Sequence, residues 1–405
     1  MTAVSPQARP RIVSLDILRG LVMVIMALDH TRDFFFRANI SGSTVATGPT
    51  DLATTTPLLF FTRWITHFCA PVFLFLAGTS AYLIGLKKGR AALGVFLVKR
   101  GIWLIVVEAV LVTFSWTFDP GYHTIIFQVI WAIGMSMVVF GLLVRLPYAW
   151  ILVLGLVIVC AHNLMDYPSL SQGLKGGLVS DLVYFGNFSV YPIHSGRVLF
   201  IVYSFLPWMG LMMLGYCFGR LYDGRLDPSS RRRIILRMGA GLILAFVVLR
   251  VINRYGDPVP WSVQPRGAVF SFLSFINVNK YPPSLLYACI TLGPALVLLG
   301  LLERSARVGL AGRFFRTYGR VPFFYYVLHV YLLHLIVVAV FYLQHFRADQ
   351  IVTPGSPFLF RPPEFGFGLV GVYLVWISVF LALYPLCRRF DAYKSTHRAW
   401  WLSYV

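Results

Sequence analysis

The first apolar segment of the chain, residues 11–36, reads RIVSLDILRGLVMVIMALDHTRDFFF. It is long enough to cross a lipid bilayer as a helix, which needs about 20 mostly apolar residues. The segment is too long for a signal peptide, lacks a small-residue cleavage site, and carries Asp16, Arg19, Asp29 and His30. We therefore predict a retained first membrane helix that bears ionisable side chains.

The composition of the whole chain also indicates a membrane protein. Hydrophobic residues make up 58% and charged residues 12% of its 405 residues, and the mean hydropathy is +0.74. Soluble domains are nearer half apolar and a quarter charged. This composition excludes a disordered, fibrous or cytosolic globular protein. It predicts an all-α, polytopic membrane fold that forms a single domain over residues 1–405.

Ten segments of the chain are long and apolar enough to span a membrane. They are residues 12–34, 59–86, 98–118, 124–144, 147–163, 199–221, 234–252, 282–302, 321–345 and 367–387. Most of the 35 basic residues fall in alternate short connections, which the positive-inside rule assigns to the cytoplasm. Both termini, as tails 1–10 and 388–405, are then cytoplasmic in the plasma (inner) membrane. The net charge of +20 thus indicates topology and does not indicate nucleic-acid binding.

Charged and polar side chains form a stripe along the first helix. Arg19 and His30 are eleven residues apart, close to three helical turns, so they share a face about 16 Å apart along the axis. Asp16 and Asp33 fall within the same stripe, and Asp16 can pair with Arg19 three residues later. Ionisable groups at membrane depth normally face the bundle interior or a wet cavity. The stripe therefore favours a functional site over a set of structural hydrogen bonds between helices, while Asp29 lies beside it and Arg32 is expected to point away.

Four motifs carry a resemblance to a known family. Arg19 and His30 are separated by ten residues, within a helix that begins SLDILRG. The other three motifs are THFCAPVFLFLAGTS (Thr66–Ser80), KYPPS (Lys280–Ser284) and GRVPFFYYVLH (Gly319–His329). Together they resemble the heparan-alpha-glucosaminide N-acetyltransferase-like family, within the transmembrane acyltransferase superfamily that includes the family-three acyltransferases.

The resemblance implies a transmembrane acyltransferase fold that takes acyl-CoA from the cytoplasm and an acceptor from the opposite side. We expect Arg19, with Asp16, to lie near the acyl-CoA. His30 is expected to act as the general base, because the ordinary pKa of histidine lies near neutral pH. Asp33 or Asp29 is expected to orient its ring, as an acid does in catalytic triads.

One departure from the family concerns the histidine that carries the acetyl group in its lysosomal members. That histidine is associated with the first outer loop, but this chain has no histidine between Thr31 and Thr66. Either His30 or His67 then takes that role, or the acyl group passes directly to the acceptor. We favour direct transfer.

Two further groups are candidates for the acceptor side. Arg63 lies four residues before His67, and the two side chains can line the same outer mouth as His30, although an interfacial histidine with a snorkelling arginine explains them equally well. Lys280 and Tyr281 precede a helix on the outer side, where the two prolines of KYPPS suit the first helical turn. Lys280 can anchor an anionic or sugar acceptor.

His329 and Glu108 are candidates inside apolar helices. His329 follows Tyr325 and Tyr326 by four and three residues and forms a polar-aromatic face with them. It is a further acceptor-binding candidate, although a hydrogen-bonded core histidine is the simpler interpretation. A lone carboxylate within a membrane helix, such as Glu108, is a functional candidate by default, and a partnership with an inner arginine is the alternative.

The most specific function that the sequence supports is transfer of an acyl group, most simply acetyl, from acetyl-CoA or another acyl-CoA. The acceptor is expected to be a hydroxyl or amine of a sugar or glycolipid at the outer face, because aromatic outer loops suit stacking on sugar rings. We expect membrane lipids as partners and no metal cofactor, because no histidine pair has metal-site spacing with a carboxylate. The oligomeric state stays open.

Two other classes of protein remain as alternatives. A buried Asp/Arg/His stripe also suits a proton-coupled transporter or flippase for a small polar or lipid-linked solute. The sequence lacks the inverted repeat and paired broken helices of many transporters. A non-catalytic assembly factor is the third alternative, and it would tolerate neutral replacements at Arg19 and His30.

Overall fold

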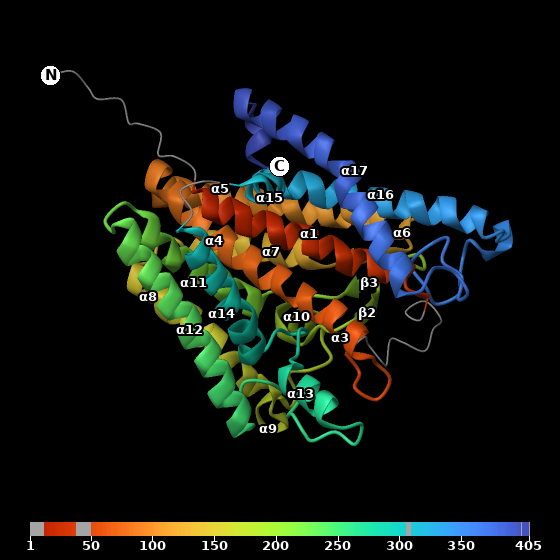
Figure 1. The fold of residues 1–405 in the computed structure, drawn as a ribbon, viewed down its shortest axis with the longest axis horizontal. Helices are drawn as coiled ribbons and strands as arrows, with labels where there is room; N and C mark the ends of the chain where they lie inside the picture. The colour runs from red at the N-terminus through yellow and green to blue at the C-terminus, as the bar shows by residue number, and fades with distance from the viewer. Residues whose placement is uncertain (1–11, 38–49, 305–308, 398, 405) are drawn as a thin grey trace.

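The computed structural model describes residues 12–37, 50–304, 309–397 and 399–404 as a mostly helical bundle (Figure 1). The expected tail 1–10 and residues 38–49, between the first two expected spans, lie outside the described residues. The expected tail 388–405 begins within a helix, because the final long helix continues to Thr396.

The elements of the first half are α1 (Val13–Phe35), α3 (Pro57–Trp64), η1 (Ile65–Phe68), α4 (Cys69–Lys88), α5 (Arg90–Val107), η2 (Glu108–Val112), α6 (Thr113–Thr117), β1 (Thr124–Phe127), α7 (Val129–Leu143), α8 (Tyr148–Ala161), η3 (His162–Asp166), α9 (Pro168–Ser171), α10 (Leu178–Ser180), η4 (Asp181–Phe185), β2 (Ser189–Pro192) and β3 (Val198–Ile201). The second half comprises α11 (Leu206–Phe218), η5 (Gly219–Tyr222), α12 (Pro228–Ile252), α13 (Ala268–Ile276), α14 (Leu285–Leu302), α15 (Leu310–Arg320), α16 (Pro322–Leu343), η6 (Ala348–Gln350), α17 (Leu369–Thr396) and η7 (Trp400–Ser403).

Six helical stretches of the described chain are long and apolar enough to cross a membrane, which is the pattern of a multi-pass membrane protein. They are Pro57–Lys88, Tyr148–Asp166, Pro228–Ile252, Leu285–Leu302, Pro322–Leu343 and Leu369–Thr396. The other four expected spans coincide with α1, α5, α7 and α11. α7 and α11 have only 15 and 13 residues, while α1 and α5 carry several charges. The mostly helical character of the prediction is confirmed, and the count of ten spans stays a prediction.

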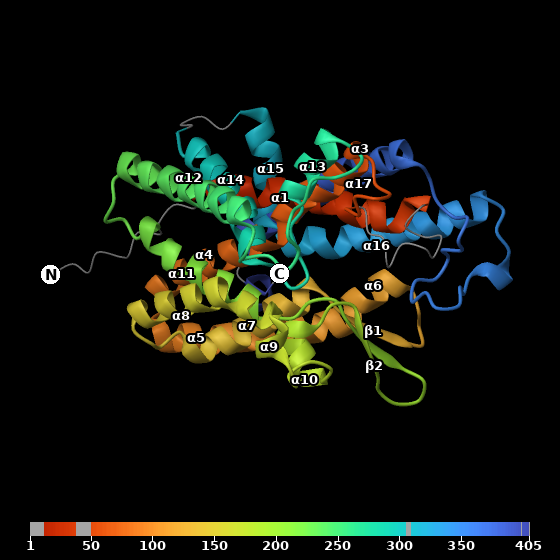
Figure 2. The same ribbon diagram turned by 90° about the horizontal axis from the view of Figure 1, so that it is seen from below.

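Two of the expected helices begin as strands, so the all-α expectation is wrong at these points. β1 pairs in parallel with β3, and β2 pairs antiparallel with β3, in a small sheet of order β1-β3-β2. Figure 2 shows the labelled strands beside α6. A short apolar run such as TIIF is compatible with either a strand or a helix, and its conformation depends on whether a pairing strand is available.

Glycines set the distance between neighbouring helices. On α5 and α7, a methyl group on Gly101 would lie 2.5 Å from the carbonyl oxygen of Gly134, and one on Gly94 would lie 2.7 Å from that of Gly141. Small residues let helix backbones approach closely in lipid, where helices gain little from apolar burial. Glycine allows the same close approach between α1 and α15, because a methyl group on Gly20 would lie 1.7 Å from the carbonyl oxygen of Phe315.

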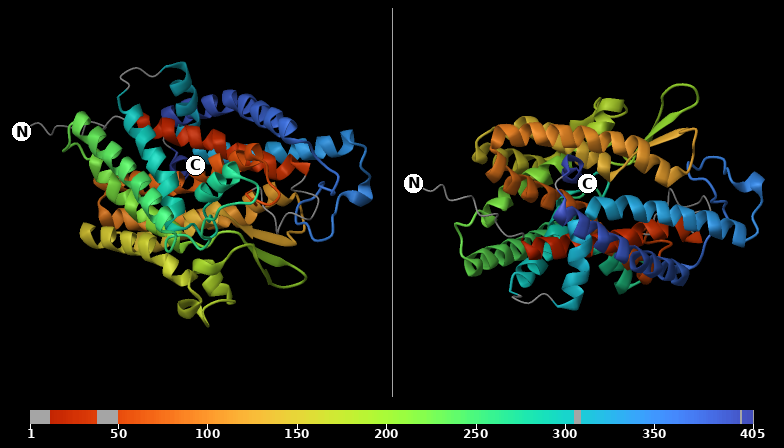
Figure 3. Two further views of the ribbon diagram at one scale, coloured as in Figure 1. Left: turned by 60° about the horizontal axis from the view of Figure 1, so that its bottom comes forward. Right: turned by 90° about the horizontal axis from the view of Figure 1, so that it is seen from above.

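α1 lies inside the bundle, in contact with α4, α14, α15, α16 and α17. Figure 3 shows α1, in red, alongside α17, in blue. Most of the helix is buried, including Asp16, Asp29 and His30. Its ionisable side chains therefore meet other helices of the protein, as the stripe in the sequence predicts. Arg32 is also buried, at 2% exposure, so the expectation that it points away is wrong.

Candidate functional site

The first turns of α1 place Arg19 among three helices. Its guanidinium contacts Asp16 Oδ1 at 3.2 Å, which confirms the predicted pair, and it also donates to Ser80 Oγ of α4 at 3.1 Å. A third hydrogen bond, of 3.3 Å, reaches the carbonyl oxygen of Gly319 on α15. Arg19 thus joins α1, α4 and α15, and Arg100 of α5 lies within electrostatic reach of it.

His30 forms a hydrogen-bonded pair with His329 of α16. Its Nδ1 lies 2.7 Å from His329 Nε2, and the two rings are stacked at 13°. His329 Nδ1 lies 2.9 Å from the carbonyl oxygen of Tyr325, which can only accept. In neutral rings, His329 therefore donates from Nδ1 and accepts at Nε2, so His30 donates from Nδ1. The network assigns the lone pair of His30 to Nε2, the tautomer that a general base requires.

His30 is the more accessible member of this pair. It retains 9% of its surface, whereas His329 is fully buried at 0%. No hydrogen bond reaches His30 Nε2 from the residues that the structure describes. A substrate proton can therefore be taken up at His30, while the hydrogen bond from His30 Nδ1 to His329 fixes the orientation of the ring. Neither Asp29 nor Asp33 accepts the Nδ1–H of His30, so the expected orienting partner is replaced by a histidine.

Three cations surround the carboxylate of Asp29, the residue directly before His30. Asp29 Oδ1 lies 2.8 Å from Arg32 Nη2. Its Oδ2 lies 2.5 Å from Arg63 Nη1 and 3.8 Å from Lys280 Nζ. All four side chains are largely buried. The group therefore carries more positive than negative charge, and burial makes such an excess costly unless an anion or a negative partner offsets it.

Asp33 lies at the edge of this group. Its side chain is 40% exposed and pairs with Arg32 at 2.6 Å, and its backbone oxygen accepts from Arg361. The guanidinium of Arg361 also lies over the rings of Phe34 and Phe358. Asp33 therefore belongs to the rim of the site, whereas Asp29 lies in its interior.

The KYPPS segment brings Lys280 and Tyr281 to the cations of α1 and α3. Lys280 Nζ lies 5.1 Å above the ring of Tyr281 and 5.8 Å above that of Tyr203. The hydroxyl of Tyr281 accepts from Arg63 Nη2 at 3.4 Å. Burial by itself would raise the pKa of Tyr281, but the positive charges of Lys280 and Arg63 lower that pKa below its usual value. Lys280, Tyr281 and Arg63 are thus brought together from two distant segments.

Asp257 holds this segment in place from the other side. Its Oδ2 accepts from the backbone N–H of Asn279 at 2.8 Å and from Ser284 Oγ at 2.6 Å. Burial raises the pKa of Asp257, and these hydrogen bonds oppose the increase. Ser284 in turn caps α14, because its Oγ accepts from the N–H of Tyr287.

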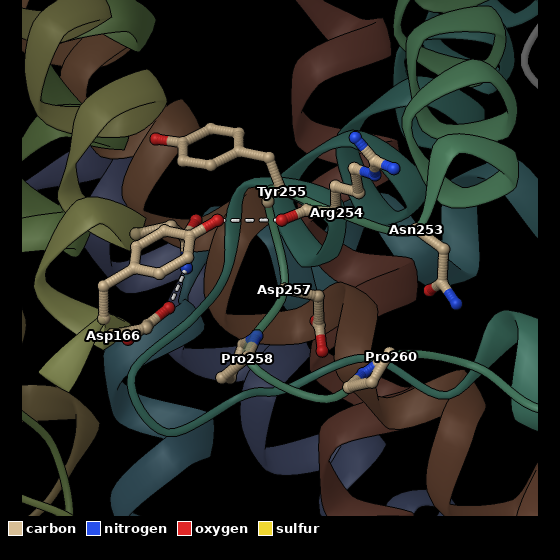
Figure 4. A pocket seen from close by; sticks show the side chains of 10 residues that line it. Asp166, Asn253, Arg254, Tyr255, Asp257, Pro258 and Pro260 are labelled. Carbon is tan, nitrogen blue, oxygen red and sulfur yellow. Dashed lines mark hydrogen bonds between the residues drawn. The ribbon is translucent and has the colours of Figure 1, made fainter.

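A pocket of about 210 Å³ lies behind the same segment. Its lining includes Asn163, Asp166, Asn253, Arg254 and Asp257, and Figure 4 shows Asp166 and Arg254 on opposite sides of it. Asn163 also accepts from the N–H of Leu285. The pocket and the charged group around Asp29 are therefore linked through residues 279–285.

His67 lies in η1, beside the charged group, and is 4% exposed. Its ring centroid is 5.3 Å from that of Tyr287, whose hydroxyl donates to the carbonyl oxygen of His67 at 2.7 Å. Its Nδ1 is buried without a hydrogen-bond partner among the described residues. Of the charges that act on His67, that of Arg63 has the largest effect, so Arg63 and His67 lie in one region.

Glu108 is fully buried in the π-helical turn η2. Its Oε1 accepts from the backbone N–H of Gln128 at 2.7 Å, and its Oε2 has no partner. No ion pair joins it to an arginine or lysine within the described ranges, so the expected inner-arginine partner is replaced by a backbone N–H.

Several residues of the site are absent from the sequence predictions. Tyr203, Arg361 and Trp116 contact Lys280, Asp33 and His30 respectively. They lie on segments far from α1 in the chain, and their spacing carries no signal. The pairing of His30 with His329 also escaped prediction, although the tyrosines beside His329 marked its face as polar.

Comparison with known proteins identifies a family to which the chain is similar. The model of the family described as "Heparan-alpha-glucosaminide N-acetyltransferase, catalytic" matches residues 11–248, more than half of the chain. The matched part includes α1, Arg63 and His67, while Lys280 and His329 lie beyond it. No functionally curated protein is similar enough to match. The chain therefore belongs to the heparan-alpha-glucosaminide N-acetyltransferase catalytic family, a family of membrane-type acetyltransferases.

Proposed function

We propose that this protein transfers an acetyl group from acetyl-CoA, bound from the cytoplasmic side, to an amine or hydroxyl of a sugar or glycolipid on the opposite side of the plasma membrane. In this proposal ten helices span the membrane and both termini are cytoplasmic. Family membership supports the acetyl transfer. The observation that carries the mechanism is the His30–His329 pair, because it leaves His30 Nε2 with an unshared lone pair.

The proposed reaction uses His30 as the general base. Its Nε2 takes the proton from the acceptor amine or hydroxyl as the acceptor attacks the thioester carbon. His329 keeps the Nδ1 proton of His30 in place, so that Nε2 stays basic. Asp29, one residue away, stabilises the imidazolium that forms by its charge. Direct transfer needs no acetyl-histidine intermediate, and His67 is the second candidate for a covalent one.

The donor is proposed to bind at the Arg19 end of α1. Asp16 and Ser80 hold the guanidinium of Arg19 in one orientation, and Arg100 lies near it. Two neighbouring arginines attract phosphate groups, such as those of CoA, because their N–H groups match the spacing of phosphate oxygens.

The acceptor is proposed to bind at the Asp29 end. Arg63 and Lys280 supply positive charge that Asp29 only partly balances, which suits an acceptor with an anionic group. Tyr281 and Tyr203 supply flat faces next to these cations, which suits a sugar ring. Arg63 and Lys280 both pair with Asp29, which directly precedes His30 in α1, and this supports an acceptor site next to His30.

The test is acetyl transfer by the purified full-length protein in lipid nanodiscs. Acetyl-CoA is the donor and methyl α-D-glucosaminide the probe acceptor, with release of CoA thiol and the mass of the product as readouts. We expect His30→Ala to lower turnover about 10²–10⁴-fold, the usual contribution of a positioned base. His123→Ala is the matched control, since His123 is 72% exposed and bonds to Asp119. Near wild-type turnover in folded His30→Ala protein would exclude the proposed base.

Binding of the donor separates an enzyme from a transporter. An acyl-CoA enzyme is stabilised by its donor, by about 2.7 kcal/mol when the donor is at a hundred times its Kd. A carrier of an unrelated solute does not respond to CoA or acetyl-CoA. Unchanged unfolding midpoints with both ligands would reject the proposed donor.

A further inference from the structure

Two buried polar atoms beside His30, and a third that acts electrostatically on one of them, have no hydrogen-bond partner among the described residues. They are the indole nitrogen of Trp116, the hydroxyl of Tyr326 and Oε2 of Glu108. Trp116 is 4%, Tyr326 3% and Glu108 0% exposed. Buried polar groups are nearly always hydrogen-bonded, so a cluster of three without partners calls for a ligand or a function.

Ring contacts place two of these groups directly against His30. The ring centroid of Trp116 lies 4.9 Å from that of His30, at 74° to it. The ring of Tyr326 lies 5.9 Å from His30, at 85°. Both rings thus stand on edge to the imidazole, and they reach it from α6 and α16. Glu108 also acts electrostatically on the Tyr326 hydroxyl, and the Trp116 side chain lies next to that hydroxyl, so the three groups converge.

Trp116 and Tyr326 are hydrogen-bond donors, and among the described residues neither donates to an acceptor. The indole N–H can only donate, and a phenol donates its one proton. The missing component is therefore an oxygen that accepts two hydrogen bonds next to the base. A thioester carbonyl provides such an oxygen, and its demand for hydrogen bonds grows as negative charge develops on it.

We propose that the indole N–H of Trp116 and the hydroxyl of Tyr326 form an oxyanion hole for the acyl group that His30 helps to transfer. This inference rests on the proposed acetyl transfer and names two catalytic residues in addition to the base. The two donors come from α6 and α16, whereas the cations paired with Asp29 come from α1, α3 and the segment before α14, so the charged group is left for the acceptor.

In the proposed step each bond that forms is matched by a bond that breaks. The acceptor nitrogen or oxygen forms a bond to the thioester carbon while its proton moves to His30 Nε2. The carbonyl π electrons move to the oxygen, whose negative charge accepts hydrogen bonds from Trp116 and Tyr326. When the C=O bond forms again, the C–S bond breaks, and the leaving CoA thiolate takes the proton from His30.

The experiment combines kinetics with a spectroscopic readout on the full-length protein in nanodiscs. Tyr326→Phe removes one oxygen atom, and Trp116→Phe removes the N–H together with part of the ring. Each variant is expected to lower kcat about 10²–10³-fold, the usual effect of losing one oxyanion donor, with little change in the KM for acetyl-CoA. Tyr331→Phe is the control, because the Tyr331 hydroxyl on the same helix bonds to the carbonyl oxygen of Leu111.

Infrared spectra of bound [1-¹³C]acetyl-CoA test the same contact without turnover. Hydrogen bonds to the thioester oxygen lower its stretching frequency, so the frequency should rise in Tyr326→Phe and stay unchanged in Tyr331→Phe. If acetyl-CoA binds to wild type and Tyr326→Phe with the same carbonyl frequency and the same kcat, the oxyanion hole is refuted while the proposed transfer stands. If acetyl-CoA does not bind to the wild type, the proposed function fails and the oxyanion hole fails with it.

Discussion

Gly20→Ala tests whether the close approach of α1 and α15 sets the donor end of the site. A methyl group at residue 20 would lie 1.7 Å from the carbonyl oxygen of Phe315 and 2.9 Å from the backbone nitrogen of Gly319. The closest comfortable C–H···O contacts are about 3.3 Å. The two helices must therefore separate by roughly 1.6 Å, because the opposing atoms belong to the backbone and cannot rotate away.

The expected cost is about 1–3 kcal/mol, the range for overpacking a well-packed core. Without the clash the same change would stabilise the helix by about 0.5–1 kcal/mol, since alanine is the better helix former. The sign of the change in stability therefore shows whether the backbone clash or the helix propensity of alanine dominates. Separation of the helices also breaks the 3.3 Å hydrogen bond from Arg19 to the carbonyl oxygen of Gly319, so affinity for acetyl-CoA should fall as well.

The assay is the unfolding midpoint in mixed micelles titrated with sodium dodecyl sulfate, together with the KM for acetyl-CoA. Gly241→Ala is the matched control, because that glycine lies on α12 with no atom within 4 Å of the added methyl group. We expect Gly241→Ala to be neutral or stabilising and Gly20→Ala to be destabilising. Equal midpoints for the two variants would refute the close α1–α15 contact.

Three further variants examine the two ends of the site. His329→Ala should lower turnover about 10²–10⁴-fold, because the Nδ1 proton of His30 loses its acceptor. His329→Gln keeps an acceptor and should recover part of the turnover with a shifted pH–rate profile. Equal rates for both variants would contradict the orienting role of His329. Lys280→Met should raise the KM for an anionic acceptor about 10- to 100-fold, corresponding to loss of a charged hydrogen bond, whereas Lys175→Met, at an exposed position between α9 and α10, should not change it. Glu108→Ala should lower the free energy of unfolding by about 1–3 kcal/mol by leaving the Gln128 N–H unpaired, and Glu108→Gln should lower it much less. The same unfolding titration compares the two variants, and equal losses of stability would contradict the role of Glu108 as acceptor for that N–H.

Local sequence signals located the helices and the first contacts within them. Each of the ten apolar segments contains a helix, because long apolar runs in lipid must satisfy their backbone hydrogen bonds internally. The Asp16–Arg19 pair was predictable from a spacing of three residues on one helix. The strands β1 and β3 were not predictable, because each is four residues long and becomes a strand only by pairing with the other.

The site itself depended on contacts between distant segments. Apart from Arg32, the residues that approach His30 and Asp29 come from positions 34 to 299 residues away along the chain. Spacing along one helix identifies His30 but carries no information on whether Asp29, Asp33 or His329 meets its Nδ1. The stripe on α1 was likewise interpreted as one face, whereas its two ends contact different helices, α15 at Arg19 and α16 at His30.

The sequence by itself determined that this chain folds in lipid as a helical protein, which helix carries the ionisable groups, and which family it resembles. These properties follow from composition, segment length and periodicity, all of which act locally along the chain. Only the tertiary structure decided that a histidine orients His30, that three cations surround Asp29, and that Trp116 and Tyr326 stand against the base. The physical reason is that partner choice depends on how helices cross, and in this protein glycine contacts such as Gly20 with α15 set those crossings.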